Sequence, residues 1–196
     1  MRFRDLPKFT KRPNWVVDVS WRYLEQQIAH FDESHSLEMD PPFQRAHVWT
    51  TDQQKAYVEF CLKGGESGRD IYWNCAGWMG SARDWYKNPI YLVDGKQRLE
   101  AVRKFLRDEL RVFDKHMPYN YPIGINYSEF EDNLSYTDAS FKFHMNDLMT
   151  YAEVLKWYLE FNSGGTPHTE DELNKVRIML AAESREDREK INERIL

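Results

Sequence analysis

The residues best suited to chemistry stand in one short stretch, residues 93–100, which reads VDGKQRLE. An apolar run ends there in the carboxylate of Asp94, followed by a glycine and by two cations, Lys96 and Arg98. A carboxylate can hold a metal ion or accept a proton, and neighbouring basic side chains suit the oxygen atoms of a phosphate. The stretch is therefore a candidate phosphate site, although the same residues also fit an ordinary turn with a solvated, charged helix start.

The elements on either side would bring these groups to a strand-to-helix turn. Residues 89–93 form a short apolar run typical of a buried strand, and Leu99, Val102 and Leu106 follow at helical spacing. The first backbone N–H groups of a helix have no partner within it, and a glycine lets the backbone come close to a ligand. Because such a helix start binds anions, we expect the phosphate site at Gly95.

The rest of the pattern predicts a mixed α/β fold, an α+β arrangement with a helical C-terminal end. Residues 141–146 alternate between apolar and polar, which is the period of a half-buried strand. The segment before Ser20, with Pro7 and Pro13, is predicted to be irregular. Further strands are predicted over residues 37–39, 71–75 and 110–113, and non-helical connections over 64–70, 76–88 and 115–125.

Helices are predicted from apolar stripes and from capping boxes, in which a Ser or Thr and a Glu, Gln or Asp three residues later bond the first helical turn. Ser20 would cap one helix, and Thr51 with Gln54 would open another that closes at residues 64–65. Three further boxes, Thr150 with Glu153, Thr169 with Glu172 and Ser184 with Asp187, predict helices over 151–161, 170–182 and 185–195. The predicted regions are an N-terminal arm and helix (1–36), a core (37–168) and C-terminal helices (169–196).

The composition limits the class of protein. The chain has 196 residues, of which 41% are hydrophobic and 30% charged, as in a globular protein with a sizeable core. No apolar run approaches the roughly 20 residues that span a bilayer, and no signal-peptide pattern is present, so we expect a cytoplasmic protein without a membrane partner. Cys61 and Cys75 fit neither a disulfide framework nor a metal pair, and the 6 histidines are scattered.

The charge argues against non-specific binding of nucleic acid, because a net charge of −5 leaves no general basic field. Basic residues are concentrated at the N-terminus and on the helix predicted after Gly95, where they fit either a solvated surface or a local contact with nucleic acid. Aromatic residues make up 15% of the chain; most must be core, and a few could stack on bases.

Two further polar clusters flank the central one along the chain. Residues 41–45 read PPFQR and are followed by VWT at 48–50, and residues 161–166 read FNSGGT. Each cluster by itself fits a plain turn. In their order and spacing, over about residues 37–173, the three clusters resemble the domain family of the GmrS half of GmrSD-type restriction systems, which is placed with the ParB/sulfiredoxin-like fold.

The resemblance implies a ParB/sulfiredoxin-like core that binds an NTP, with ATP as the first candidate, together with Mg²⁺. It assigns catalysis to Asp94, Arg98 and Arg45, with Asp94 as general base or Mg²⁺ ligand. It assigns nucleotide or phosphate binding to Gly95, Lys96, Gln97, Gln44, Asn162, Ser163, Gly164 and Gly165. Lys96 stands where the family usually has glutamine. Structural salt bridges at the two arginines and a helix C-cap at Asn162 remain the alternative interpretation.

The activity implied by the resemblance is that of an NTP-dependent phosphotransferase or NTPase acting in a DNA context. One example would be a kinase that phosphorylates a hydroxymethylated base in phage DNA, within the host cytoplasm. Two alternatives stay open: a nuclease or nickase subunit directed at modified DNA, and a non-catalytic sensor of nucleotide or DNA modification in a defence system. Partners would be nucleotide, modified DNA, and nuclease or DNA-modification proteins. The sequence contains no Walker-type P-loop, so a P-loop mechanism is not expected.

Overall fold

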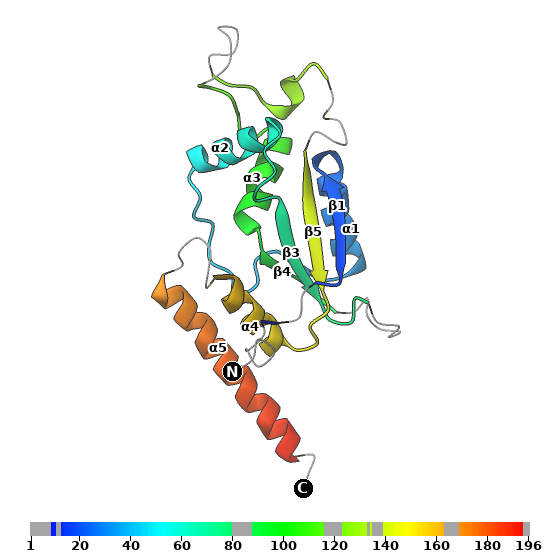
Figure 1. The fold of residues 1–196 in the computed structure, drawn as a ribbon, viewed down its shortest axis with the longest axis vertical. Coiled ribbons are helices and arrows are strands. Elements are labelled where there is room, and N and C mark those ends of the chain that lie inside the picture. Colours follow the sequence, from blue (N-terminus) through cyan, green and yellow to red (C-terminus); the bar gives the residue numbers. More distant parts are fainter. Residues whose placement is uncertain are drawn as a thin grey trace, which may run out of the picture.

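The structure, a computed structural model, describes residues 9–10, 13–79, 88–115, 123–132, 134, 139–162 and 169–193, with residues 186–193 described by their backbone alone. Its centre is a 5-stranded sheet in the order β1-β5-β3-β4-β2 (Figure 1). The strands are β1 (Trp15–Ser20), β2 (Leu37–Glu38), β3 (Asp70–Cys75), β4 (Ile90–Asp94) and β5 (Ser140–Asn146). The β3–β5 and β2–β4 pairs are parallel and the β1–β5 and β3–β4 pairs antiparallel, so the predicted mixed α/β class is confirmed.

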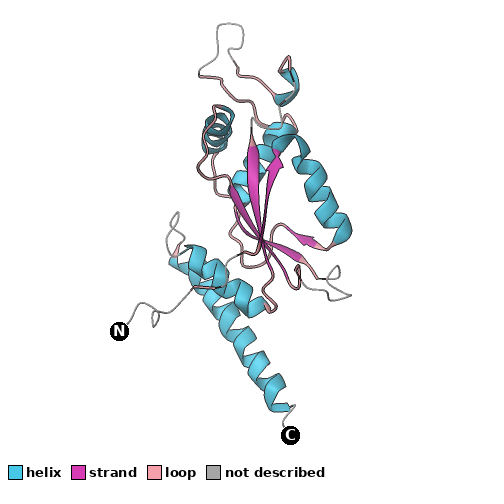
Figure 2. Ribbon diagram, turned by 45° about the vertical axis from the view of Figure 1, so that its right-hand side comes forward, coloured by secondary structure: helices cyan, strands magenta, loops and turns pink. Residues whose placement is uncertain are grey.

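Helices pack on both faces of this sheet. Helices α1 (Leu24–Ser34), α2 (Thr51–Leu62) and α3 (Lys96–Leu106) form the larger core with inward side chains of the strands, such as Trp73 and Phe143. A smaller core lies where α4 (Tyr151–Asn162) packs against α5 (Glu170–Glu193), at one end of the sheet (Figure 2). Because successive side chains of a strand point to opposite faces, Tyr72 and His144 face away from the larger core.

The N-terminal part differs from the sequence prediction. Residues 15–20 form β1, an edge strand that pairs with β5 along its whole length, where an irregular segment is predicted. The helix predicted after Ser20 is present, and its apolar stripe is buried, but it begins as a short 3₁₀ turn (η2, Trp21–Tyr23). Ser20 makes no side-chain capping bond. The region boundaries after residues 36 and 168 remain predictions, and β1 joins the first of these regions to the central sheet.

The capping box of α2 lies one residue earlier in the sequence than predicted. The box consists of Thr50 and Gln53: the Thr50 hydroxyl accepts from the Gln53 N–H at 3.3 Å, and the Gln53 side chain accepts from the Thr50 N–H at 2.8 Å. Gln54, predicted to close the box, is 4% exposed and instead donates to the Trp49 carbonyl at 3.1 Å. Gln54 is therefore buried and bonded to the protein interior, and the exposed Gln53 caps the helix.

Two of the three capping boxes predicted in the C-terminal part are confirmed. Thr150 with Glu153 opens α4, and Thr169 with Glu172 opens α5. The third box, at Ser184, is wrong, because α5 runs without interruption from Glu170 to Glu193. The Ser184 hydroxyl donates to the Leu180 carbonyl at 2.8 Å, one turn back in the same helix, so Ser184 bonds within α5 instead of capping a new helix.

The strand predicted over residues 110–113 is reduced to one isolated bridge between Val112 and Ile125. Phe113 has a φ of 61°, in the left-handed region, and an extended strand cannot continue through that conformation. Most of the predicted connections at 76–88 and 115–125 lies outside the described residues.

Cys61 and Cys75 are free thiols buried in the larger core. Burial raises the pKa of both thiols, that of Cys75 to about 11, so neither is a reactive thiolate near neutral pH. Within the described residues, no helix combines the length and the apolar character needed to cross a membrane.

Glu25 links α1 to α3 through two ion pairs. Its Oε1 lies 2.8 Å from Arg103 Nε and its Oε2 lies 2.8 Å from Arg107 Nη2. Burial acts to raise the pKa of Glu25, but the hydrogen bonds and charges of the two arginines outweigh it and lower the pKa below its usual value. A lowered pKa in the folded state adds stability above the unfolded pKa of about 4.3, and that stability is lost as the pH falls through the folded value.

Glu25→Gln is therefore expected to lower the free energy of unfolding by ~0.5–1 kcal/mol at neutral pH, the range for partly exposed ion pairs. The loss should shrink as the pH falls below about 4, where the wild-type carboxyl becomes protonated as well. Urea titrations of wild type and variant, at neutral pH and below about pH 4, measure the loss of unfolding free energy under each condition. Glu33→Gln, at an exposed position of the same helix, is the control, and an equal loss for Glu25→Gln at both pH values would contradict the prediction.

Candidate functional site

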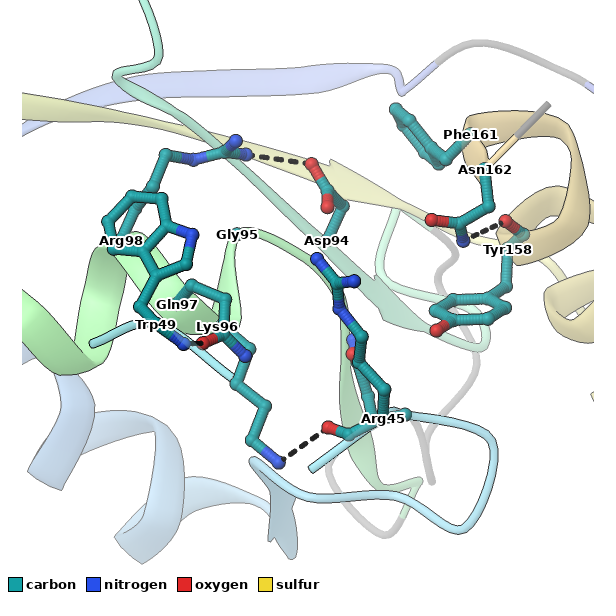
Figure 3. A pocket seen from close by; sticks show the side chains of 11 residues that line it. Arg45, Trp49, Asp94, Gly95, Lys96, Gln97, Arg98, Tyr158, Phe161 and Asn162 are labelled. Carbon is teal, nitrogen blue, oxygen red and sulfur yellow. Dashed lines mark hydrogen bonds and ion pairs between the residues drawn. The ribbon is translucent and has the colours of Figure 1, made fainter. Parts of the chain in front are cut away.

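The three polar clusters, which are far apart in the sequence, line one cavity (Figure 3). It lies at the end of β4, where the chain turns into α3, and α4 closes its other side. Its volume is about 140 Å³. The residues that line it are Gln44, Arg45, Trp49, Asp94, Gly95, Lys96, Gln97, Arg98, Tyr158, Phe161 and Asn162. The structure thus brings together every predicted site residue that it describes.

Gly95 forms the turn between β4 and α3. It is the N-cap residue of α3, with a φ of 103° in the left-handed region, and it supplies no side-chain capping bond. A Cβ at this position would lie 2.5 Å from the Ile71 side chain and 3.3 Å from the Ile71 Cα. Both the backbone conformation and the close approach of β3 therefore require glycine here. The first turn of α3 consequently faces the cavity with N–H groups that no cap side chain covers.

Arg98 is held in place from two sides. Its Nη2 donates to Asp94 Oδ2 at 2.7 Å and to the backbone carbonyl of Asp70, on β3, at 2.9 Å. The salt bridge that the sequence left open as an alternative is therefore present, and both of its partners line the cavity. An arginine anchored in this way presents its guanidinium in one orientation, and its Nη1 group remains for contact with a phosphate oxygen, because Nη2 makes both bonds and Nε is buried.

Arg45 approaches the same cavity from the opposite side. Figure 3 shows its guanidinium pointing into the cavity below Asp94. Among the described residues, the Arg45 guanidinium makes no ion pair, so its charge is available to a ligand anion. Next to it, burial raises the pKa of Tyr158 to about 12, although the charge of Arg45 and a hydrogen bond from its backbone act in the other direction. Tyr158 is therefore a neutral hydroxyl at neutral pH.

Lys96 joins the central cluster to the first one. Its Nζ lies 2.5 Å from Asp40 Oδ1 and donates to the Arg45 carbonyl at 3.1 Å. The Lys96 side chain is only 16% exposed, whereas that of Asp40 is 74% exposed. Lys96 thus holds the backbone beside Arg45 and adds a positive charge to the cavity wall.

The two predicted glutamines also bind protein backbone. Gln97 is 8% exposed, and its Oε1 accepts from the N–H groups of Val48 and Trp49 at 3.0 and 3.1 Å. Its Nε2 donates to the Ala46 carbonyl at 3.3 Å. Both the oxygen and the nitrogen of the Gln97 side-chain amide thus hold residues 46–49 against α3, so Gln97 supports the cavity wall.

Gln44 binds the backbone of β4 in the same way as Gln97 binds residues 46–49. Its Nε2 donates to the carbonyls of Leu92 and Val93, each at 2.9 Å. The end of β4 is thereby tied to the loop that carries Arg45. Gln44 and Gln97 together set the position of that arginine relative to Asp94.

Gln97→Met keeps the length of the side chain but removes all three hydrogen bonds. Because it leaves two N–H groups and a carbonyl of a part-buried segment without this partner, we expect the free energy of unfolding to fall by about 2 kcal/mol. Chemical denaturation measures the loss. Gln26→Met, at an exposed position of α1, is the matched control and should stay within ~0.5 kcal/mol of wild type. A neutral Gln97→Met variant would rule out the supporting role.

The third cluster contributes the end of α4. The Asn162 side-chain amide donates to the Tyr158 carbonyl at 2.7 Å, one turn back, so it satisfies a carbonyl of the last helical turn while lining the cavity. Ser163, Gly164 and Gly165 lie outside the described residues, and their predicted contacts to a nucleotide stay predictions.

Three lining residues received no role from the sequence: Trp49, Tyr158 and Phe161. Trp49 and Phe161 belong to the polar clusters, but composition does not show which aromatic residues are core and which line a site. Tyr158 lies four positions before Asn162, and this helical spacing places both on one face of α4. The four-residue spacing to Asn162 is therefore the sequence signal that indicates Tyr158 as a lining residue.

The size and the donor groups of the cavity limit what it can hold. About 140 Å³ is below the ~300–1,000 Å³ of typical sites for whole small molecules, so the enclosed part fits a phosphoryl group and not a whole nucleotide. Asp94 is the one carboxylate among the described lining residues, and the described residues contain no group of three or more His, Cys, Asp or Glu side chains that could hold a metal ion. One carboxylate suits a Mg²⁺ ion that arrives on a substrate phosphate.

No family model matches this chain, and no curated protein sequence and no solved structure matches it either. The geometry of the cavity therefore carries the argument on function.

Proposed function

We propose that this chain is an NTP-dependent phosphotransferase or NTPase that acts in a DNA context. One observation carries the proposal: Arg45 of the first cluster and Lys96 and Arg98 of α3 line one phosphoryl-sized cavity at a helix start, together with Asp94, the one carboxylate among the described lining residues. Transfer of a phosphoryl group depends mainly on positioning and on stabilising the charge of the moving group, and this arrangement suits both.

The groups of the cavity can be assigned to the steps of a transfer. Arg45 and Arg98 would contact oxygen atoms of the terminal phosphate from opposite sides, and the neutral Tyr158 hydroxyl could donate a hydrogen bond. The bond from the terminal phosphorus to the bridging oxygen breaks, a bond to the acceptor oxygen forms, the acceptor proton passes to the Asp94 carboxylate, and NDP leaves. In its alternative role, Asp94 would instead hold a Mg²⁺ ion that neutralises charge on the phosphate oxygens, and the acceptor proton would pass to solvent.

The acceptor is water in an NTPase or a hydroxyl group in a kinase. The resemblance of the three clusters to a restriction-system domain supports a hydroxyl on a modified base of DNA. With a net charge of −5, the chain would meet DNA in a transient encounter and not by tight general binding.

A second candidate follows from a specific feature of the cavity. Asp94, Lys96 and Gln97 all have hydrogen-bond partners inside the protein, so the groups that would perform chemistry are partly occupied. This favours a sensor that binds the nucleotide without turning it over.

The test is a transfer assay with NTPs labelled at the terminal phosphate, in the presence of Mg²⁺. Three reactions are compared: no acceptor, unmodified DNA and hydroxymethylated DNA. Label on the modified DNA supports the kinase, and label released as free phosphate supports the NTPase. If every NTP binds but none is consumed, the sensor replaces the enzyme. Nicking of supercoiled plasmid without any use of NTP would instead favour the nuclease alternative.

A further inference from the structure

A second cavity adjoins the first and has a different chemical character. Its volume is about 450 Å³, within the range of sites for whole small molecules. Five aromatic rings line it: Tyr72 and His144 from the sheet, Trp157 and Phe161 from α4, and Phe9 from the N-terminal segment. Its remaining wall consists of Thr10, Pro13 and Glu160.

The rings are arranged at well-defined angles. Tyr72 and His144 are stacked, with centroids 4.6 Å apart and planes at 16°, and Trp157 stands at 89° to Tyr72 with centroids 6.1 Å apart. The Phe161 ring packs against both Tyr72 and Trp157, with ring centroids 4.5 Å and 5.2 Å apart. These rings pack on one another and together give the cavity a continuous aromatic wall.

Polar contacts hold this aromatic wall in place. The His144 Nε2 lies 2.6 Å from Asp70 Oδ1, which links neighbouring strands β5 and β3. On the opposite side, the Thr10 N–H donates to Glu160 Oε2 at 2.8 Å, which ties the segment near Phe9 to α4. Apart from that of Phe9, the rings thus stand on two strands and a helix, and a ligand would meet a preformed surface.

Two observations connect this cavity to the site at Gly95. Phe161 lines both cavities, so the two spaces share a wall. Tyr72 of β3 is also the strand partner of Asp94 of β4. A molecule with a phosphate beside Asp94 therefore has the aromatic cavity next to it, across the ring of Phe161.

We propose that the cavity of Tyr72, His144, Trp157 and Phe161 is a nucleobase subsite. Aromatic side chains bind bases by stacking, and the contact tolerates different bases because every base has a π face. The inference rests on the proposed function to the extent that the neighbouring cavity takes phosphate. The base belongs either to the NTP or to the acceptor nucleotide of a DNA strand turned out of its stack.

The test compares ligands that carry a base, a phosphate or both. Nucleosides are titrated by saturation-transfer NMR, and NTPs and inorganic tripolyphosphate by calorimetry. Tyr72→Leu removes the stacking ring but keeps an apolar side chain, and His144→Gln removes the second ring of the stack but keeps a polar group near Asp70. Tyr127→Leu removes a partly buried tyrosine that packs on Phe105, away from both cavities, and is the matched control.

We expect wild type and Tyr127→Leu to bind at least one nucleoside. Tyr72→Leu and His144→Gln should weaken nucleoside binding about tenfold and leave the affinity for tripolyphosphate unchanged. A matching loss for the NTP identifies its base as the occupant. A loss only for an oligonucleotide with a hydroxymethylated base, against the same strand with an abasic site, identifies the acceptor base.

The failures of the two proposals are distinguishable. If nucleosides bind through Tyr72 but tripolyphosphate does not bind, the subsite stands and the phosphate site fails. If tripolyphosphate binds as tightly as NTP and no nucleoside binds, the subsite is wrong. It is also wrong if choline, the kind of cation that aromatic cages hold, binds at Tyr72 and nucleosides do not. Melting curves by circular dichroism show whether each variant folds, and Tyr72→Leu and His144→Gln report independently of each other.

Discussion

Asp94→Asn is expected to slow the consumption of NTP by about 100- to 10,000-fold, the usual contribution of a positioned acid or base. Asparagine has the shape of aspartate and can still accept the hydrogen bond of Arg98, which also keeps its contact with the Asp70 carbonyl. It cannot take up the proton of an acceptor hydroxyl, and it is a weaker ligand for Mg²⁺. The substitution therefore removes chemistry while leaving the architecture of the cavity in place.

The measurement is the initial rate of transfer from an NTP labelled at the terminal phosphate, together with NTP affinity from calorimetry. Asp52→Asn, at an exposed position in the first turn of α2, is the control and should keep the wild-type rate. A rate for Asp94→Asn within about threefold of wild type would contradict a catalytic role for this carboxylate. Tight NTP binding by wild type and by the variant, with turnover by neither, would support the sensor.

Gly95→Ala is expected to lower the free energy of unfolding by about 3 kcal/mol, the sum of two costs. A residue with a Cβ pays ~1–2 kcal/mol to occupy the left-handed region, and a tight core adds ~1–3 kcal/mol when a methyl group is forced into it. Here the added Cβ would meet the Ile71 side chain at 2.5 Å and its Cα at 3.3 Å, so β3 and the start of α3 must move apart.

Gly64→Ala separates the two costs. Gly64 has a similar φ of 89°, but a Cβ at that position meets no atom within 4 Å. It should therefore lose only the conformational part, ~1–2 kcal/mol. Urea denaturation of both variants measures the difference. Equal losses would mean that the contact with Ile71 relaxes without cost, and that the tight packing of β3 on the turn does not hold the cavity in position.

Local patterns predicted the turn at Gly95 well. The apolar run before it is β4, and the helical spacing after it is α3, because both signals arise from neighbours within one element. The box at Thr150 is also local, since both partners lie within one helical turn. The class of the fold and the strand-to-helix turn that carries Asp94 and Gly95 follow from such patterns.

Elements that depend on distant partners were predicted poorly. Strand β1 was missed because its partner β5 is remote in the sequence and the nearby prolines suggest irregular chain. The box of α2 moved by one residue because Gln54 is drawn into the interior, and a pattern of capping residues does not show which glutamine will be buried. The continuity of α5 through Ser184 has the same explanation, since a serine can cap a helix or bond within it.

The sequence by itself determined the chemical groups of the site, namely a carboxylate, a glycine and basic residues at the start of a helix. Only the tertiary structure decided how they are used. Gln97 finds its partners 49 and 48 positions away in the first cluster, and it supports the wall there. Arg98 is locked to Asp94, whereas Arg45 makes no ion pair among the described residues. Side-chain contacts between remote segments arise only when the core brings the segments together, so the cavity at Gly95 and the aromatic cavity beside it are properties of the folded chain.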